Sequence, residues 1–298
     1  MKKKKRAIIV LVLLIVILSI VYALLRFDLL GIKEEVPVVE EEEVIVEVVE
    51  EEKDNPNALL REKWEENKKI NPDYVGQIVF DSGIVDLPFV QAYDVYDSSG
   101  NLYNFYDTDG NKITDMESGC DGYSCTGNDV YLWTDWKTME YDKYENGGSA
   151  FMDYRNRLYD ENLIIYGHHF AHSFDPDRVK AFTCFEKFED YDYYEDNKYL
   201  NLVLDGEIRR YIVASACKVN IYDEEAEYYR TNLNYDIEGN EDLDYKETFF
   251  KHIKDIEFYD TGVELTNDDY TLILQTCVSL EPEYREILIC KQIEVIRG

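Results

Sequence analysis

Basic residues are scarce in this 298-residue chain, where 31 Lys and Arg stand against 63 Asp and Glu. Six of the basic residues lie at or before position 26. The chain beyond that position therefore carries 25 basic residues against 63 acids, a formal charge of −38. A surface this acidic repels nucleic acid and anionic lipid headgroups, which argues against a nucleic-acid partner. Apolar residues still make up 45% of the chain, so a fully disordered protein is excluded.

Long apolar runs are also lacking, with one exception at the amino terminus. Residues 7–25 carry no charge and follow the basic segment KKKKR. Nineteen helical residues rise about 28 Å, close to the roughly 30 Å of a bilayer core. The run is long for a signal peptide, and no small-residue cleavage motif follows it. Because Lys and Arg prefer the cytoplasmic side, we expect a basic tail at 1–6 inside, a transmembrane anchor at 7–26, and the rest of the chain outside the cell.

The segment that follows the anchor is strongly acidic. Residues 34–54 hold eleven acids against one Lys. Such a sequence is typical of a solvated, self-repelling spacer, although a binding tail for a basic partner is an alternative. We expect the spacer to cover 27–54 and one folded domain to cover 55–298, a length that supports a single core.

The hydrophobic pattern of the domain predicts a mainly β structure. The predicted strands cover 75–80, 84–90, 149–153, 162–166, 199–204, 208–216, 270–277 and 287–296. The predicted helices cover 57–70, 179–188 and 244–256. Strands outnumber helices and short turns dominate, which favours a closed β-barrel with helices on its rim.

One region, 93–146, does not fit this pattern, and we call it the insert. Asp97–Asn101 and Asp107–Asn111 each have the composition of a tight turn between aromatic-rich strands, so we expect one or two appended hairpins. Three acids there, Asp107, Asp109 and Asp115, raise the question of a calcium site. An EF-hand loop needs Gly at its sixth position, whereas Gly110 is fourth from Asp107, which favours a plain turn.

Four His and six Cys limit the possible chemistry. Three of the histidines, His168, His169 and His172, directly follow a predicted strand. Cys277 ends another strand, and Arg285 lies eight residues beyond it. A Cys with a distant His is a candidate nucleophile pair, since thiolate is the reactive form and a nearby imidazolium favours it. By spacing alone, a small buried hydrophobic Cys is the commoner explanation.

The same residue types also suit a zinc site or a disulfide. The three histidines with Asp175 or Asp177 are a zinc alternative, but the segment is loop-like and no second ligand cluster is apparent, so we expect no metal. Disulfides are allowed outside the cytoplasm, and Cys120 and Cys125 are close enough in sequence to pair.

Several motifs occur in a consistent order along the domain. They are NPDYVG at 71–76, DLPFVQ at 86–91, GSAFMDYRN at 148–156, NLIIYGH at 162–168, FYDTGV at 258–263, and LQTC at 274–277 with Arg285 ahead of ILI at 287–289. Together they resemble the class B sortases, which are membrane-anchored cysteine transpeptidases of Gram-positive bacteria. The resemblance covers most of 55–298.

The resemblance implies an eight-stranded β-barrel with a Cys–His–Arg site and no cofactor. Carried over by motif, Cys277 is the nucleophile, His168 the acid/base partner and Arg285 the cation that stabilises the oxyanion or positions the substrate. His168 is chosen over His169 because it directly follows Tyr166-Gly167. Such a thiolate attacks a Thr carbonyl of a sorting peptide, and the thioester then passes to an amine.

The sequence also departs from the family pattern. In the family's Thr-Leu-x-Thr-Cys run, Ile273 replaces the first Thr, and Gln275 fills the variable position, where Ser is frequent. Thr276, Gln275 and Asn156 are weaker candidates for substrate contact. The insert is longer than the usual family link, either as a surface decoration or as a partner-docking or substrate-shaping element.

We therefore expect a sortase-type enzyme of the cell membrane that cleaves a sorting signal after Thr. The acceptor would be an amine of a peptidoglycan cross-bridge or a pilin Lys, the latter in a pilin-polymerising enzyme. An inactive sortase-fold scaffold and a metal-dependent hydrolase are the alternatives.

Overall fold

The computed structural model describes residues 56–114, 125–143, 147–170, 182–222, 243–278 and 281–297. All of them belong to one unit, Glu51–Gly298. Within these ranges no helix is both long and apolar enough to cross a membrane, and the anchor expected at 7–26 lies outside them.

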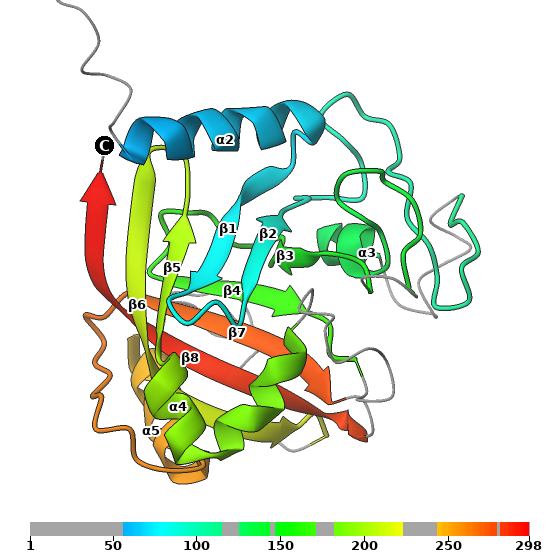
Figure 1. The fold of residues 1–298 in the computed structure, drawn as a ribbon. Helices are drawn as coiled ribbons and strands as arrows, with labels where there is room; N and C mark the ends of the chain where they lie inside the picture. The colour runs from blue at the N-terminus through cyan, green and yellow to red at the C-terminus, as the bar shows by residue number, and fades with distance from the viewer. Residues whose placement is uncertain are drawn as a thin grey trace, which may run out of the picture. The chain divides into compact units, whose positions relative to one another are not determined.

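Eight strands close into a barrel in the order β1-β2-β3-β4-β7-β8-β6-β5, which confirms the predicted closed β-barrel. The strands are β1 (Tyr74–Phe80), β2 (Asp86–Val90), β3 (Ala150–Met152), β4 (Asn162–Gly167), β5 (Tyr199–Val203), β6 (Glu207–Asn220), β7 (Thr271–Val278) and β8 (Glu281–Arg297). β4 runs parallel to β7, and β7 runs antiparallel to β8. The three strands are adjacent in the barrel (Figure 1). Cys277 belongs to β7, Arg285 belongs to β8, and His168 directly follows β4.

Alternate residues of the strands fill the barrel with apolar side chains. Leu163, Leu272 and Leu274 belong to this core, and each is at most 2% exposed. The predicted helix near 179–188 is present as a 3₁₀ helix, η2 (Phe182–Glu189). Its buried rings join the same core. Three-residue spacing suits 3₁₀ geometry, since residues i and i+3 of such a helix point the same way.

The opposite faces of β4, β7 and β8 are covered as well. Helix α5 (Leu243–Ile256) packs Phe249 and Ile253 against a second apolar cluster that includes Ile164 and Ile273. Strands that are buried on both faces read as continuous apolar runs instead of alternating ones. This burial explains why these strands were predictable from the sequence.

The remaining helices lie outside the barrel wall. α2 (Pro56–Ile70) lies across the end of β1, and α3 (Gly127–Leu132) lies beside β3 (Figure 1). The expected helix at 57–70 is therefore present. α3 and α4 (Tyr191–Asn197) were not predicted.

The hairpins expected in the insert are not formed as strands. Each turn is closed by a single bridge, Tyr96 to Leu102 and Tyr106 to Lys112. The Asp107 carboxylate accepts hydrogen bonds from the backbone N–H groups of Asp109 and Asn111, at 2.9 and 2.8 Å. This arrangement is a side-chain-stabilised turn, as the sequence favoured. Asp115 lies outside the described residues.

Candidate active site

Strand register brings the three catalytic candidates to neighbouring positions. Gly167, the last residue of β4, pairs with Thr276 of β7, so the residues that follow this pair are His168, just beyond β4, and Cys277 of β7. On the other side of β7, Cys277 pairs directly with Arg285 of β8. Adjacent strands lie about 4.8 Å apart. The three residues therefore come from three consecutive strands at one end of the barrel wall.

Side-chain alternation places these three residues on the same face of the sheet. Residues two apart on a strand point the same way. Cys277 therefore shares the outer face with Ile273, and His168 shares it with Ile164; both isoleucines lie in the cluster under α5. The site is thus on the outside of the barrel, at the edge of the covered region.

A cavity of about 180 Å³ opens where the three strands meet, and we call it the active-site cavity. It is lined by Leu132, Phe151, Tyr166, Gly167, His168, Gln275, Thr276, Cys277 and Arg285. Cys277 is half-buried there. All three catalytic candidates from the sequence therefore border one small cavity, together with a residue of the insert, Leu132.

His168 is held by two neighbouring residues at the end of α3. Its Nε2 lies 2.5 Å from the Leu132 carbonyl oxygen, and its ring stacks on Trp133 with centroids 4.5 Å apart. A carbonyl oxygen only accepts hydrogen bonds, so Nε2 carries the proton and Nδ1 is the nitrogen left for proton exchange. Burial lowers the pKa of the imidazole. No carboxylate pairs with it among the residues described.

Arg285 presents an uncompensated positive charge to the cavity. Its Nη1 donates to the backbone carbonyls of Pro282 and Tyr284, at 2.7 and 2.9 Å. Within the described ranges no carboxylate lies within ion-pair distance of this guanidinium. Backbone carbonyls fix the group without neutralising it, so its charge is available to an oxyanion.

The weaker candidates separate into two groups. Gln275 and Thr276 line the cavity, and the Gln275 Oε1 and Thr276 Oγ1 atoms are buried without a hydrogen-bond partner in the described part of the chain. Asn156 does not line it. Its amide donates to the Asn162 carbonyl and accepts from the Ile164 N–H, so it holds the start of β4 in place.

Only one of the two described histidines of this segment lines the active-site cavity. His169 does not line it, and its Nε2 lies 3.3 Å from a Glu186 carboxylate oxygen. His172, Asp175 and Asp177 lie outside the described residues. Among the residues that are described, no group of three potential ligands is placed to bind a metal ion.

The cysteines differ in their surroundings. Cys184, Cys217 and Cys290 are free thiols, and burial raises the pKa of the first two to about 12 and that of Cys290 further still. Thiols of this kind form little thiolate at neutral pH. Cys125 is disulfide-bonded, and its partner lies outside the described residues. Cys277 is the free thiol that borders the active-site cavity.

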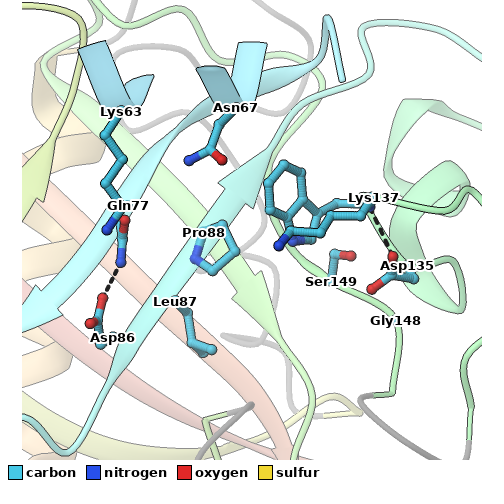
Figure 2. A pocket seen from close by; sticks show the side chains of 11 residues that line it. Lys63, Asn67, Gln77, Asp86, Leu87, Pro88, Asp135, Lys137, Gly148 and Ser149 are labelled. Atoms are coloured by element: carbon cyan, nitrogen blue, oxygen red, sulfur yellow. Dashed lines mark hydrogen bonds between the residues drawn. The ribbon is translucent and has the colours of Figure 1, made fainter. Parts of the chain in front are cut away.

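A larger cavity of about 370 Å³ lies between α2, β2 and the insert, and it shares no lining residue with the active-site cavity. Figure 2 shows Lys63 and Asn67 from α2 on one side of it, with Lys137 and Ser149 on another. Its lining contains neither a thiol nor an imidazole. The larger cavity therefore lacks the residue types of a Cys–His site.

Comparison with known proteins agrees with the resemblance seen in the motifs. No protein-family model matches the sequence, and neither does any curated protein. Solved structures do match. Sortase B of Clostridium perfringens superposes with a TM-score of 0.55 at 22% identity, over 77% of this chain and 99% of that one. The chain has the fold of the class B sortases.

A second sortase B, from Staphylococcus aureus in a substrate complex, gives a TM-score of 0.55 at 23% identity, over 78% of this chain and 86% of that one. A mutant form of the C. perfringens enzyme gives 0.57 at 22% identity, over 80% and 90% of the two chains. The sortase fold thus extends over most of the described residues.

Proposed function

We propose that this protein is a sortase-type cysteine transpeptidase. The observation that carries the proposal is the register of β4, β7 and β8, which places His168, Cys277 and Arg285 around one cavity. Each residue type suits its step: a thiol for nucleophilic attack, an imidazole for proton transfer, and a guanidinium for the developing negative charge.

In the first half-reaction, the Cys277 thiolate attacks the carbonyl carbon of the Thr in a sorting signal. The carbonyl oxygen becomes an oxyanion, which the Arg285 guanidinium stabilises. When the peptide C–N bond breaks, the leaving amine takes a proton that His168 carries at Nδ1. The product is a thioester between Cys277 and the substrate.

In the second half-reaction, an amine attacks the thioester carbonyl. Its extra proton passes to His168, the C–S bond breaks, and the Cys277 thiolate returns. We infer an amine of a peptidoglycan cross-bridge or a pilin Lys as the acceptor, on a protein anchored at 7–26 with its catalytic domain outside the cell.

The test is a joining reaction with the full-length chain. Fluorescent sorting-signal peptides are incubated with triglycine or a Lys-containing peptide as the acceptor, and mass spectrometry identifies the products. We expect a peptide joined at Thr to the acceptor, lost in Cys277→Ala and after alkylation but retained with a chelator. Loss of product with the chelator alone would favour a metal-dependent hydrolase. No product with any pair would favour a scaffold.

A further inference from the structure

The insert contributes directly to the active site through the end of α3. Leu132 is the last residue of α3 and Trp133 is its C-cap, and both contact the His168 ring. The Trp133 indole N–H makes no hydrogen bond within the described ranges, so the indole contacts the site by stacking on the His168 ring. This pair comes from a segment 35 or more residues before His168, outside the sheet.

The position of α3 is tightly fixed by its neighbours. Asn128 accepts from the Tyr154 N–H at 2.8 Å, which ties α3 to the end of β3. A Cβ on Gly127 would lie 2.0 Å from the Ala92 carbonyl oxygen, so the helix backbone is in close contact with the chain after β2. The backbone of His168 is fixed too, since its carbonyl accepts from the Phe182 N–H at 2.8 Å. The stack therefore joins two rigid supports.

We propose that Trp133 is a positioning residue for His168. With the Leu132 carbonyl, it holds the imidazole in one ring orientation, with Nε2 engaged and Nδ1 left for proton transfer. This inference rests on the proposed function in one respect only, namely that proton transfer by His168 contributes to turnover.

The surroundings of His168 explain why an aromatic ring suits this role. A catalytic His is often oriented by a carboxylate, which also stabilises the imidazolium. Among the described residues, the charged or titratable side chains that line the cavity with His168 are Tyr166 on β4, Cys277 on β7 and Arg285 on β8. Lys143 lies on the Trp133 side, with its Nζ 5.4 Å from the indole ring centroid. Trp133 supplies orientation without negative charge, and it excludes water from one face of the ring.

Two effects follow from this arrangement. The ring is restricted, which favours turnover because misplacing a reacting group by about 1 Å can cost roughly 100-fold. The imidazole is also desolvated, in line with its lowered pKa. Removing the indole should therefore reduce turnover and raise the pKa of His168 towards the ordinary value of about 6.5.

The experiment is an NMR titration of the His168 imidazole in the full-length chain, with its signal assigned by its loss in His168→Asn. Trp133→Ala removes the ring and Trp133→Phe retains a smaller one. Trp136→Phe is the matched control, because Trp136 lies in the same segment but packs on Tyr74, with centroids 5.4 Å apart. Circular dichroism establishes that each variant is folded.

In the wild-type chain we expect a ring-current shift of the His168 signal, and we expect the midpoint of its pH titration below about 6.5. Trp133→Ala should remove the shift and raise the midpoint, Trp133→Phe should lie between, and Trp136→Phe should match the wild type. In the joining assay, Trp133→Ala should lower kcat about 10- to 100-fold with KM nearly unchanged.

Either of two results would overturn the inference: a His168 signal that Trp133→Ala leaves unchanged, or an equal change in Trp136→Phe. A wild-type chain without turnover would contradict the proposed function, whereas the titration would still decide whether Trp133 sets the state of His168.

Discussion

Two regions of the molecule line the same cavity, namely the insert and the ends of β4, β7 and β8. Different interactions hold each region in place. In the sheet, register and alternation fix where Cys277, His168 and Arg285 lie. In the insert, side-chain-stabilised turns, single bridges and close packing hold the chain. The sheet positions the candidate catalytic residues, whereas the insert determines the surroundings of one of them, His168.

The largest effect should come from removing the thiol that we propose as the nucleophile. Cys277→Ala should abolish formation of the joined product, because no thioester can form. The matched control is Cys184→Ala, which removes another free thiol whose pKa burial raises to about 12. Steady-state rates of both variants check this. An equal loss of activity in both variants, or full activity in Cys277→Ala, would contradict the assignment of Cys277 as the nucleophile.

Next in size is the loss of the cavity's positive charge. Arg285→Ala should lower kcat about 100- to 1,000-fold, the usual cost of losing one oxyanion donor, with Arg285→Lys in between. Arg297→Ala is the control on the same strand, since Arg297 is exposed and pairs with Glu207. If kcat is retained in Arg285→Ala while KM rises, the guanidinium binds substrate instead of stabilising the oxyanion.

The inner face of the same strand ends carries a buried acid, which gives a pH-dependent prediction. Glu286 pairs in register with Thr276 and is 3% exposed. Burial, with Glu186 and Glu189 nearby, raises its pKa to about 7. The unfolded chain releases this proton near pH 4.3. The protonated Glu286 carboxyl therefore makes its full contribution to folding stability below about pH 4, and this contribution is lost as pH rises through 7.

Glu286→Gln should remove this loss, because the amide stays neutral. At pH 8 we expect the variant to exceed the wild type in free energy of unfolding by on the order of 2 kcal/mol, with little difference at pH 4. Urea denaturation at both pH values measures this, with exposed Glu294→Gln as the control. A lower stability of Glu286→Gln at pH 8 would show that the carboxylate is ionised and paired.

The smallest effects should come from the outer turns of the insert. Gly100 and Gly110 both have a left-handed backbone, with φ of 80° and 82°, and alanine there should cost about 1–2 kcal/mol. A Cβ on Gly110 also meets the Tyr141 ring at 3.0 Å, whereas one on Gly100 meets nothing within 4 Å. Hydrogen exchange should show more local opening in Gly110→Ala, with activity unchanged in Gly100→Ala. Reduced activity in Gly100→Ala would link the turns to the site.

The barrel was predictable because its strands are continuous apolar runs or follow clear turns. The catalytic candidates were predictable because they occur at strand ends within recognisable motifs. Leu132 and Trp133 were not, since a backbone carbonyl and a stacked ring leave no periodic signal. The packing of the insert likewise depends on contacts between residues far apart in the sequence. Asn156 is the opposite case. The motif predicted a contact with substrate, whereas the side chain hydrogen-bonds the backbone of Asn162 and Ile164 at the start of β4.

The most direct test of the account is intact-mass analysis of the full-length chain incubated with sorting-signal peptides and no acceptor amine. We expect a mass gain equal to the peptide up to its Thr, located at Cys277, released by hydroxylamine and absent in Cys277→Ala. An adduct on another residue, or no adduct with any peptide while Cys277 resists alkylation, would contradict it.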